Sequence, residues 1–215
     1  MKSSLAGPGE GPRPPYAPAS GAQPYYAYAA QALAERYESL TFESVHGEIL
    51  HLLPTAPVRV ADIGAGTGRD AAALAGRGHE VLAVEPVREL RLVAQQLHAD
   101  APIAWLEDSL PGLERLEGRF GLLLLSAVWM HLDASQRTAA MRRLAGLLDP
   151  GGLLIISLRH GPPPADRTMF DVPADETAAL ARENGLDVLH LGGGQDQLGR
   201  DAIHWSELAL RKAPA

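Results

Sequence analysis

The chain has 215 residues, which is enough for one sizeable α/β domain with a short appendage. Its 26 acidic and 19 basic side chains give a net charge of -7, so a phosphate-tracking surface is disfavoured and we expect no nucleic-acid partner. The chain has no Cys, which excludes disulfides and Cys-ligated metal, and no group of histidines has metal-ligand spacing, so we expect no metal.

Residues 1–23 are rich in Pro, Gly, Ala and Ser, and such a segment cannot bury enough apolar surface to offset its chain entropy. We therefore predict a disordered tail. No apolar run follows Lys2, and no stretch is apolar and long enough to span a bilayer. These features favour a cytoplasmic protein without a membrane partner.

Residues 24–57 are predicted to form one or two helices, and Pro54 and Pro57 end the second. Four of the five tyrosines lie between Tyr25 and Tyr37. They either pack this segment on the domain or form a helical lid whose hydroxyls face a ligand pocket. We select the lid, with Tyr25 and Tyr37 as candidate substrate contacts.

The segment that follows joins a strand to a helix through three glycines. It runs Val-Arg-Val-Ala-Asp-Ile-Gly-Ala-Gly-Thr-Gly from Val58 to Gly68 and continues as Arg-Asp-Ala-Ala-Ala-Leu. Glycine allows a sharp turn and a close approach of ligand to backbone, and the helix offers free N–H groups. A nucleotide site is therefore predicted here. The dinucleotide fingerprint G-x-G-x-x-G would require glycine at position 69, where this chain has Arg69.

Glu85 follows the next predicted strand and lies 19 positions after Gly66, about the offset at which an acid binds a ribose diol. Periodicity and turn residues predict the other elements. Strands are expected at 80–84, 103–106, 120–125, 153–158, 186–191 and 202–210, helices at 86–98, 134–148 and 174–184, and long loops at 159–172 and 192–200.

The glycine turn, with Asp62 before it, resembles motif I of the class I S-adenosylmethionine-dependent methyltransferases, and the element order from Val58 to Arg211 is also similar. The resemblance implies a Rossmann-like α/β fold with a seven-stranded, mostly parallel sheet, helices on both faces and an N-terminal helical extension. The last strand would be inserted antiparallel. Residues 58–215 would form the methyltransferase domain.

The same resemblance implies S-adenosyl-L-methionine as the cofactor and S-adenosyl-L-homocysteine as the product. Asp108 would accept from the adenine amino group, and the N–H of Ser109 or Leu110 would face a ring nitrogen. The candidate cofactor-binding residues are Asp62, Gly64, Ala65, Gly66, Gly68, Glu85, Pro86, Asp108, Ser109, Leu110 and Ser126.

Candidate catalytic and substrate-binding residues follow the fourth and fifth predicted strands, where ligands bind in a parallel sheet. His131 is a candidate general base, and His160 is a second. Arg159 or Arg167 can hold a substrate carboxylate in fork geometry. Trp129 is a further candidate substrate contact.

We expect in-line transfer of the methyl group to an N, O or S nucleophile of a small molecule, mainly through proximity and orientation. The chain lacks the Asn/Asp-Pro-Pro-Tyr type of signature found in family members that methylate amino-adenine or glutamine. Two alternatives remain, a non-catalytic S-adenosylmethionine-binding regulator and an NAD-dependent oxidoreductase. The protein is expected to be a monomer or a homodimer.

Overall fold

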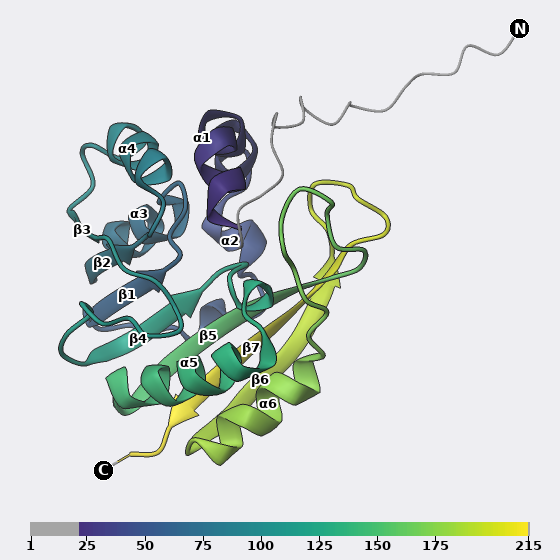
Figure 1. The fold of residues 1–215 in the computed structure, drawn as a ribbon. Helices are drawn as coiled ribbons and strands as arrows, with labels where there is room; N and C mark the ends of the chain where they lie inside the picture. Colours follow the sequence, from purple (N-terminus) through teal and green to yellow (C-terminus); the bar gives the residue numbers. More distant parts are fainter. Residues whose placement is uncertain (1–21, 215) are drawn as a thin grey trace, which may run out of the picture.

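The computed structural model describes residues 22–214, so most of the predicted tail lies outside the described residues. One seven-stranded sheet, in the order β3-β2-β1-β4-β5-β7-β6, runs through the molecule (Figure 1). Strands β1 to β5 pair in parallel, and β7 lies antiparallel between β5 and β6. The predicted fold class is therefore confirmed, including the inserted last strand.

The strands are β1 (Arg59–Ile63), β2 (Glu80–Val84), β3 (Ile103–Leu106), β4 (Phe120–Leu125), β5 (Leu148–His160), β6 (Leu186–Gln195) and β7 (His204–Lys212). The helices are α1 (Gln23–Glu38), α2 (Phe42–Val45), α3 (Arg69–Gly76), α4 (Arg88–Leu97), α5 (Ala134–Leu147) and α6 (Ala174–Glu183), with short 3-10 turns at η1 (Leu50–Leu52) and η2 (Trp129–His131). Within residues 22–214, no helix is long and apolar enough to cross a membrane.

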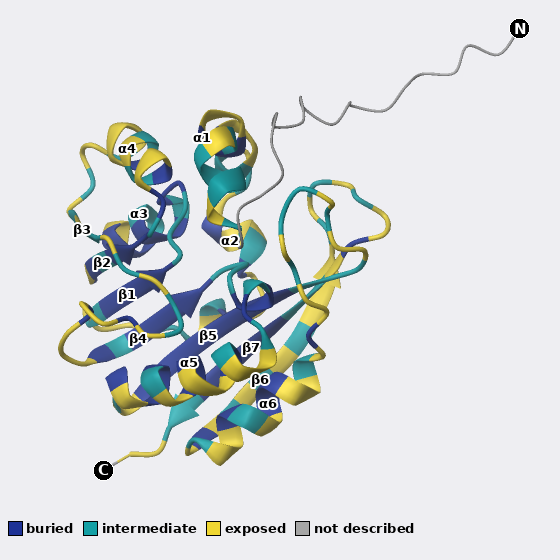
Figure 2. Ribbon diagram, in the orientation of Figure 1, coloured by how far each residue is buried: buried dark blue, intermediate teal, exposed yellow. Residues whose placement is uncertain are grey.

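Both faces of the sheet are covered, as the uninterrupted apolar run of β4 predicts. Side chains of successive strand residues point to opposite faces, so Leu123 and Leu125 pack with α5 and α6, whereas Leu122 and Leu124 pack with α3. The central strands are accordingly buried along almost their whole length (Figure 2). This rigid sheet fixes the carboxyl ends of β1, β2, β4 and β5 at one edge.

The N-terminal segment forms a helix as predicted, but its second helix is shorter than expected. α1 packs on α4, with Ala30 against Leu90. The Thr41 and Ser44 side chains cap α2 in a reciprocal capping box. α2 ends at Val45, and His46 then turns inward to two buried carboxylates instead of continuing a helical face.

The predicted loop at 192–200 is wrong over its first residues, because β6 continues through the triple glycine to Gln195. A Cβ on Gly193 would lie 2.1 Å from the carbonyl oxygen of Trp205 on the neighbouring strand. Glycine allows β6 and β7 to pair at this point, where a side chain would separate them. β5 is also longer than predicted and carries a register irregularity near its start.

Candidate active site

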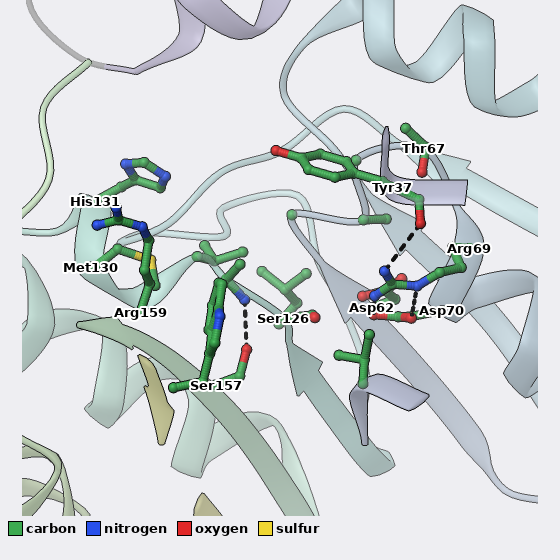
Figure 3. A pocket seen from close by; sticks show the side chains of 18 of the residues that line it. Tyr37, Asp62, Thr67, Arg69, Asp70, Ser126, Met130, His131, Ser157 and Arg159 are labelled. Carbon is green, nitrogen blue, oxygen red and sulfur yellow. Dashed lines mark hydrogen bonds and ion pairs between the residues drawn. The ribbon is translucent and has the colours of Figure 1, made fainter. Parts of the chain in front are cut away.

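A cavity of about 780 Å³ lies over the carboxyl ends of the parallel strands and beneath α1. Asp62, Arg69 and Asp70 lie at one side of the cavity, and Met130, His131 and Arg159 at the other, with Ser126 and Ser157 between them (Figure 3). In open α/β sheets, ligands bind at this edge. The cavity is therefore the candidate active site.

The glycine turn forms part of the cavity wall, and its backbone requires glycine. Gly64 and Gly66 have φ angles of 72° and 57°, a region that L side chains rarely adopt. A Cβ on Gly64 would also lie 2.4 Å from Cγ2 of Val128. Gly68, at φ 84°, caps α3 and lies against Trp105. Its neighbours Thr67 and Arg69 line the cavity, whereas Gly68 does not.

Glu85 lies at the end of β2 and joins the glycine turn to the next loop. Its carboxylate accepts hydrogen bonds from the N–H groups of Gly66 (2.9 Å) and Val87 (2.8 Å). Burial raises the pKa of Glu85, while these two bonds oppose the shift. Each oxygen keeps a further lone pair for a hydroxyl donor, as a ribose site requires.

Asp62 lies at the end of β1 and is buried in the cavity wall. Its Oδ2 atom has no hydrogen-bond partner among the described residues. Burial, followed by the negative charge of Asp70, raises the pKa of Asp62 well above its usual value. A buried carboxyl without a partner is costly, so the site favours a ligand with a cationic or hydrogen-bond-donating group here.

Behind Asp62 lies a buried charge network that the sequence did not reveal. His46 contacts Glu207 of β7 through Nδ1 (2.5 Å) and Asp70 of α3 through Nε2 (3.2 Å). Arg69 holds Asp70 through two hydrogen bonds of 2.7 and 2.9 Å. Burial would lower the pKa of His46, but the bonds to Asp70 and Glu207 raise it to about 9. The network joins the segment after α2 to α3 and β7, and its members Arg69, Asp70 and Glu207 line the cavity.

The loop after β3 brings Asp108, Ser109 and Leu110 to the cavity as predicted. Oδ1 of Asp108 accepts from the N–H of Ser109, and Oδ2 accepts from the N–H groups of Arg115 and Leu116. Asp108 therefore organises its own loop, and Oδ1 retains capacity for one more donor. Ala65, Pro86 and Ser126 also line the cavity.

Tyr26 and His131 form a hydrogen-bonded pair at the opposite side. Nε2 of His131 lies 3.0 Å from the Tyr26 hydroxyl, and Nδ1 lies 2.8 Å from the Thr168 carbonyl oxygen. A carbonyl can only accept, so Nδ1 carries the proton and neutral Nε2 accepts from Tyr26. Burial and the charge of Arg167 lower the pKa of His131, although the Thr168 bond opposes the shift. The lowered pKa keeps the imidazole neutral, with the Nε2 lone pair directed at Tyr26.

Tyr26 was missed by the sequence analysis, which selected Tyr25 and Tyr37. Tyr37 lines the cavity, but Tyr25 lies outside it. The Tyr25 ring packs under Arg167, whose guanidinium carbon lies 4.3 Å from the centroid of that ring. Tyr26 and Tyr37 share one helix face with buried Ala30 and Leu33. That spacing along α1 is the signal that identifies Tyr26.

Two further predicted site residues lie outside the cavity. Trp129 is completely buried in the core, and its indole N–H donates to Thr177 of α6, so the predicted substrate contact is wrong. His160 hydrogen-bonds Ser206 and stacks on His204. Because β5 continues to His160, alternate residues Ser157 and Arg159 face the cavity and His160 does not.

Comparison with known sequences identifies a methyltransferase domain over residues 60–152. An uncharacterised methyltransferase of Mycobacterium bovis is 34% identical over 116 residues, which cover 51% of this chain and 58% of the relative. An uncharacterised methyltransferase of Mycobacterium tuberculosis is 33% identical over 104 residues, or 48% of this chain and 40% of that relative. The chain thus spans 58% and 40% of the lengths of these two curated relatives.

Solved structures share the fold at low sequence identity. The magnesium protoporphyrin IX methyltransferase of Synechocystis with bound S-adenosylmethionine has a TM-score of 0.65 and 16% identity, covering 87% of this chain and 84% of that one. The 1,6-didemethyltoxoflavin N1-methyltransferase of Burkholderia thailandensis has a TM-score of 0.59 and 23% identity, covering 93% and 94%. The [4+2]-cyclase SpnF also has this fold, with a TM-score of 0.67, 11% identity and coverage of 90% and 96%. Residues 60–152 therefore match a methyltransferase domain, and the described chain shares the fold of these solved structures.

Proposed function

We propose that this protein transfers a methyl group from S-adenosylmethionine to a nucleophile on a small molecule. The observation that best supports this proposal is that one cavity has two chemically different ends. The glycine turn and Glu85 lie at one end, and the Tyr26–His131 pair lies at the other. A transferase requires such an arrangement, with a donor site that opens directly onto an acceptor site.

The donor end fits S-adenosylmethionine in shape and charge. Glu85 would accept from the ribose hydroxyls, and the loop from Asp108 to Leu110 would contact the adenine. The unpartnered Oδ2 of Asp62 matches the ammonium group of the methionine portion. Gly66 has open space where a Cβ would stand, so a ligand can approach its backbone. The absence of a third dinucleotide-type glycine at Arg69 continues to disfavour NAD.

When bound, the sulfonium group supplies a methyl already activated for displacement. The protein must then align the acceptor and exclude water, and orientation can contribute about 7–11 kcal/mol in the best intramolecular models. α1 contributes Tyr26 and Tyr37 to the cavity, and we propose that residues 24–57 act as the lid that closes over both ligands.

Tyr26 and His131 would remove a proton from an O–H or N–H acceptor. Nε2 of His131 already accepts from Tyr26, so the acceptor meets the Tyr26 oxygen first. The acceptor proton passes to that oxygen as Tyr26 gives its own proton to His131. Burial raises the pKa of Tyr26, which keeps the phenol neutral and makes it a relay. A positioned base of this kind contributes about 10²- to 10⁴-fold.

Production of S-adenosylhomocysteine tests the proposal directly. The protein would be incubated with S-adenosylmethionine and a panel of small aromatic and aliphatic hydroxyl, amine and carboxylate compounds, and mass spectrometry would follow both product and acceptor. We expect at least one acceptor to gain a methyl group in step with S-adenosylhomocysteine. Cofactor binding without turnover on any member of a broad panel would support the non-catalytic, regulatory alternative instead.

A further inference from the structure

Three arginines converge on the acceptor side of the cavity from separate elements. Arg159 is the next-to-last residue of β5, Arg167 lies in the following loop, and Arg200 lies in the loop between β6 and β7. Burial lowers the pKa of Arg159, and the charges of Arg200 and Arg167 lower it further. Arg159 therefore lies within electrostatic range of both other guanidinium groups.

The carboxylates of this region compensate the three charges unequally. Asp196 forms a fork with Arg200 at 2.5 and 2.9 Å and also accepts from the Trp205 indole. Arg167 has one hydrogen bond, at 2.8 Å, to Asp166. In residues 22–214, the recorded hydrogen bond of Arg159 is to a neutral group, the carbonyl of Pro162, at 3.0 Å. Arg159 thus lacks a carboxylate partner of its own.

Both Arg159 and Arg167 have a buried Nε–H without a hydrogen-bond partner in the described part of the chain. Burying a charged N–H donor away from water costs free energy unless an acceptor forms a hydrogen bond with it. The Nε–H edge of a guanidinium binds the two oxygens of a carboxylate in parallel. Two open donors match a carboxylate better than a phosphate, whose oxygens require more donors.

We propose that the methyl acceptor carries a carboxylate, which Arg159 and Arg167 bind and which positions the nucleophile beside the Tyr26 hydroxyl. Arg167 links the two groups, because its guanidinium carbon lies 5.7 Å from the Tyr26 ring centroid. Asp62 and Glu85 lie at the donor end, whereas Arg159 and Arg167 lie at this end. A cationic donor and an anionic acceptor would therefore enter opposite ends. This inference rests on the proposed function.

Calorimetry on the protein saturated with S-adenosylhomocysteine tests the acceptor class. The probes are small aromatic and aliphatic carboxylates, each beside its primary amide, with inorganic phosphate as a separate probe. We expect at least one carboxylate to bind about tenfold or more tightly than its amide. If no carboxylate exceeds its amide, or if phosphate binds more tightly than every carboxylate, the inference is overturned.

Substitution assigns the effect to the arginines. We expect Arg159→Gln to remove about tenfold or more of the carboxylate affinity and to leave S-adenosylhomocysteine affinity unchanged. Arg142→Gln, on the exposed face of α5, is the matched control and should alter neither. Loss of S-adenosylhomocysteine affinity in folded Arg159→Gln would assign this arginine to the cofactor and refute the inference. Failure of wild-type protein to bind S-adenosylhomocysteine would instead refute the proposed function.

Discussion

Replacement of Glu85 with alanine tests the ribose site. The substitution removes two hydrogen bonds to the backbone, from Gly66 and Val87, and would also remove the acceptor for the ribose hydroxyls. A hydrogen bond to a charged group contributes about 1.5–3 kcal/mol, so cofactor affinity should fall about 10- to 150-fold. The buried N–H of Val87 and the partly buried N–H of Gly66 would lose their acceptor, which should also lower the free energy of unfolding by about 1–3 kcal/mol.

The assay is calorimetric titration with S-adenosylhomocysteine, accompanied by denaturant unfolding of the same samples. Glu80→Ala is the matched control, because Glu80 lies on the same strand with a side chain that is 78% exposed and an ion-pair contact of 3.5 Å to Arg59. An exposed pair of this kind contributes about 0–1 kcal/mol, so neither quantity should change greatly. Wild-type affinity in a folded Glu85→Ala protein would refute the ribose assignment.

Three further predictions concern the base, the charge network and the glycine turn. His131→Ala and Tyr26→Phe should each reduce turnover about 10²-fold without changing cofactor affinity. Normal turnover of either variant in steady-state assays would show that the pair has only a structural role. The pKa of His46 is raised to about 9. The stabilisation that its positive charge provides is therefore fully present below pH 6.5 and is lost as the pH rises through 9. The free energy of unfolding, measured in denaturant, should therefore fall by about 3 kcal/mol across that interval, and a slope unchanged in His46→Gln would contradict this. Gly64→Ala should lower the melting temperature and weaken cofactor binding, whereas Gly76→Ala, with open space and a helical backbone, should be neutral or slightly stabilising. Equal melting temperatures for the two variants would refute the strain argument.

The sequence predicts the sheet well wherever local signals decide the structure. The bounds of β2, β3 and β4 agree with the predicted strands, because polar residues and turns enclose each apolar run. Glu85 also lies beside the glycine turn and accepts from the N–H of Gly66, since both residues follow neighbouring parallel strands. These features depend on short-range sequence patterns and on the rule that ligands bind at the carboxyl ends of parallel strands.

The errors arise where distant segments decide which way a side chain faces. Tyr25 and Tyr26 are adjacent, and the packing of α1 on α4 turns Tyr26 into the cavity. His160 faces away because β5 extends further than its apolar run indicates. The role of His46 has no local signal, because its partner Glu207 lies 161 residues away in the sequence.

The central claim is that the glycine turn and Glu85 bind S-adenosylmethionine. Calorimetry of the purified protein with S-adenosylmethionine, S-adenosylhomocysteine and NAD in parallel tests it most directly. We predict binding of the two adenosyl ligands with dissociation constants on the order of micromolar, equivalent to about 8 kcal/mol, and no binding of NAD. Binding of NAD alone, or no adenosyl binding by a demonstrably folded protein, would contradict the assignment of the donor site.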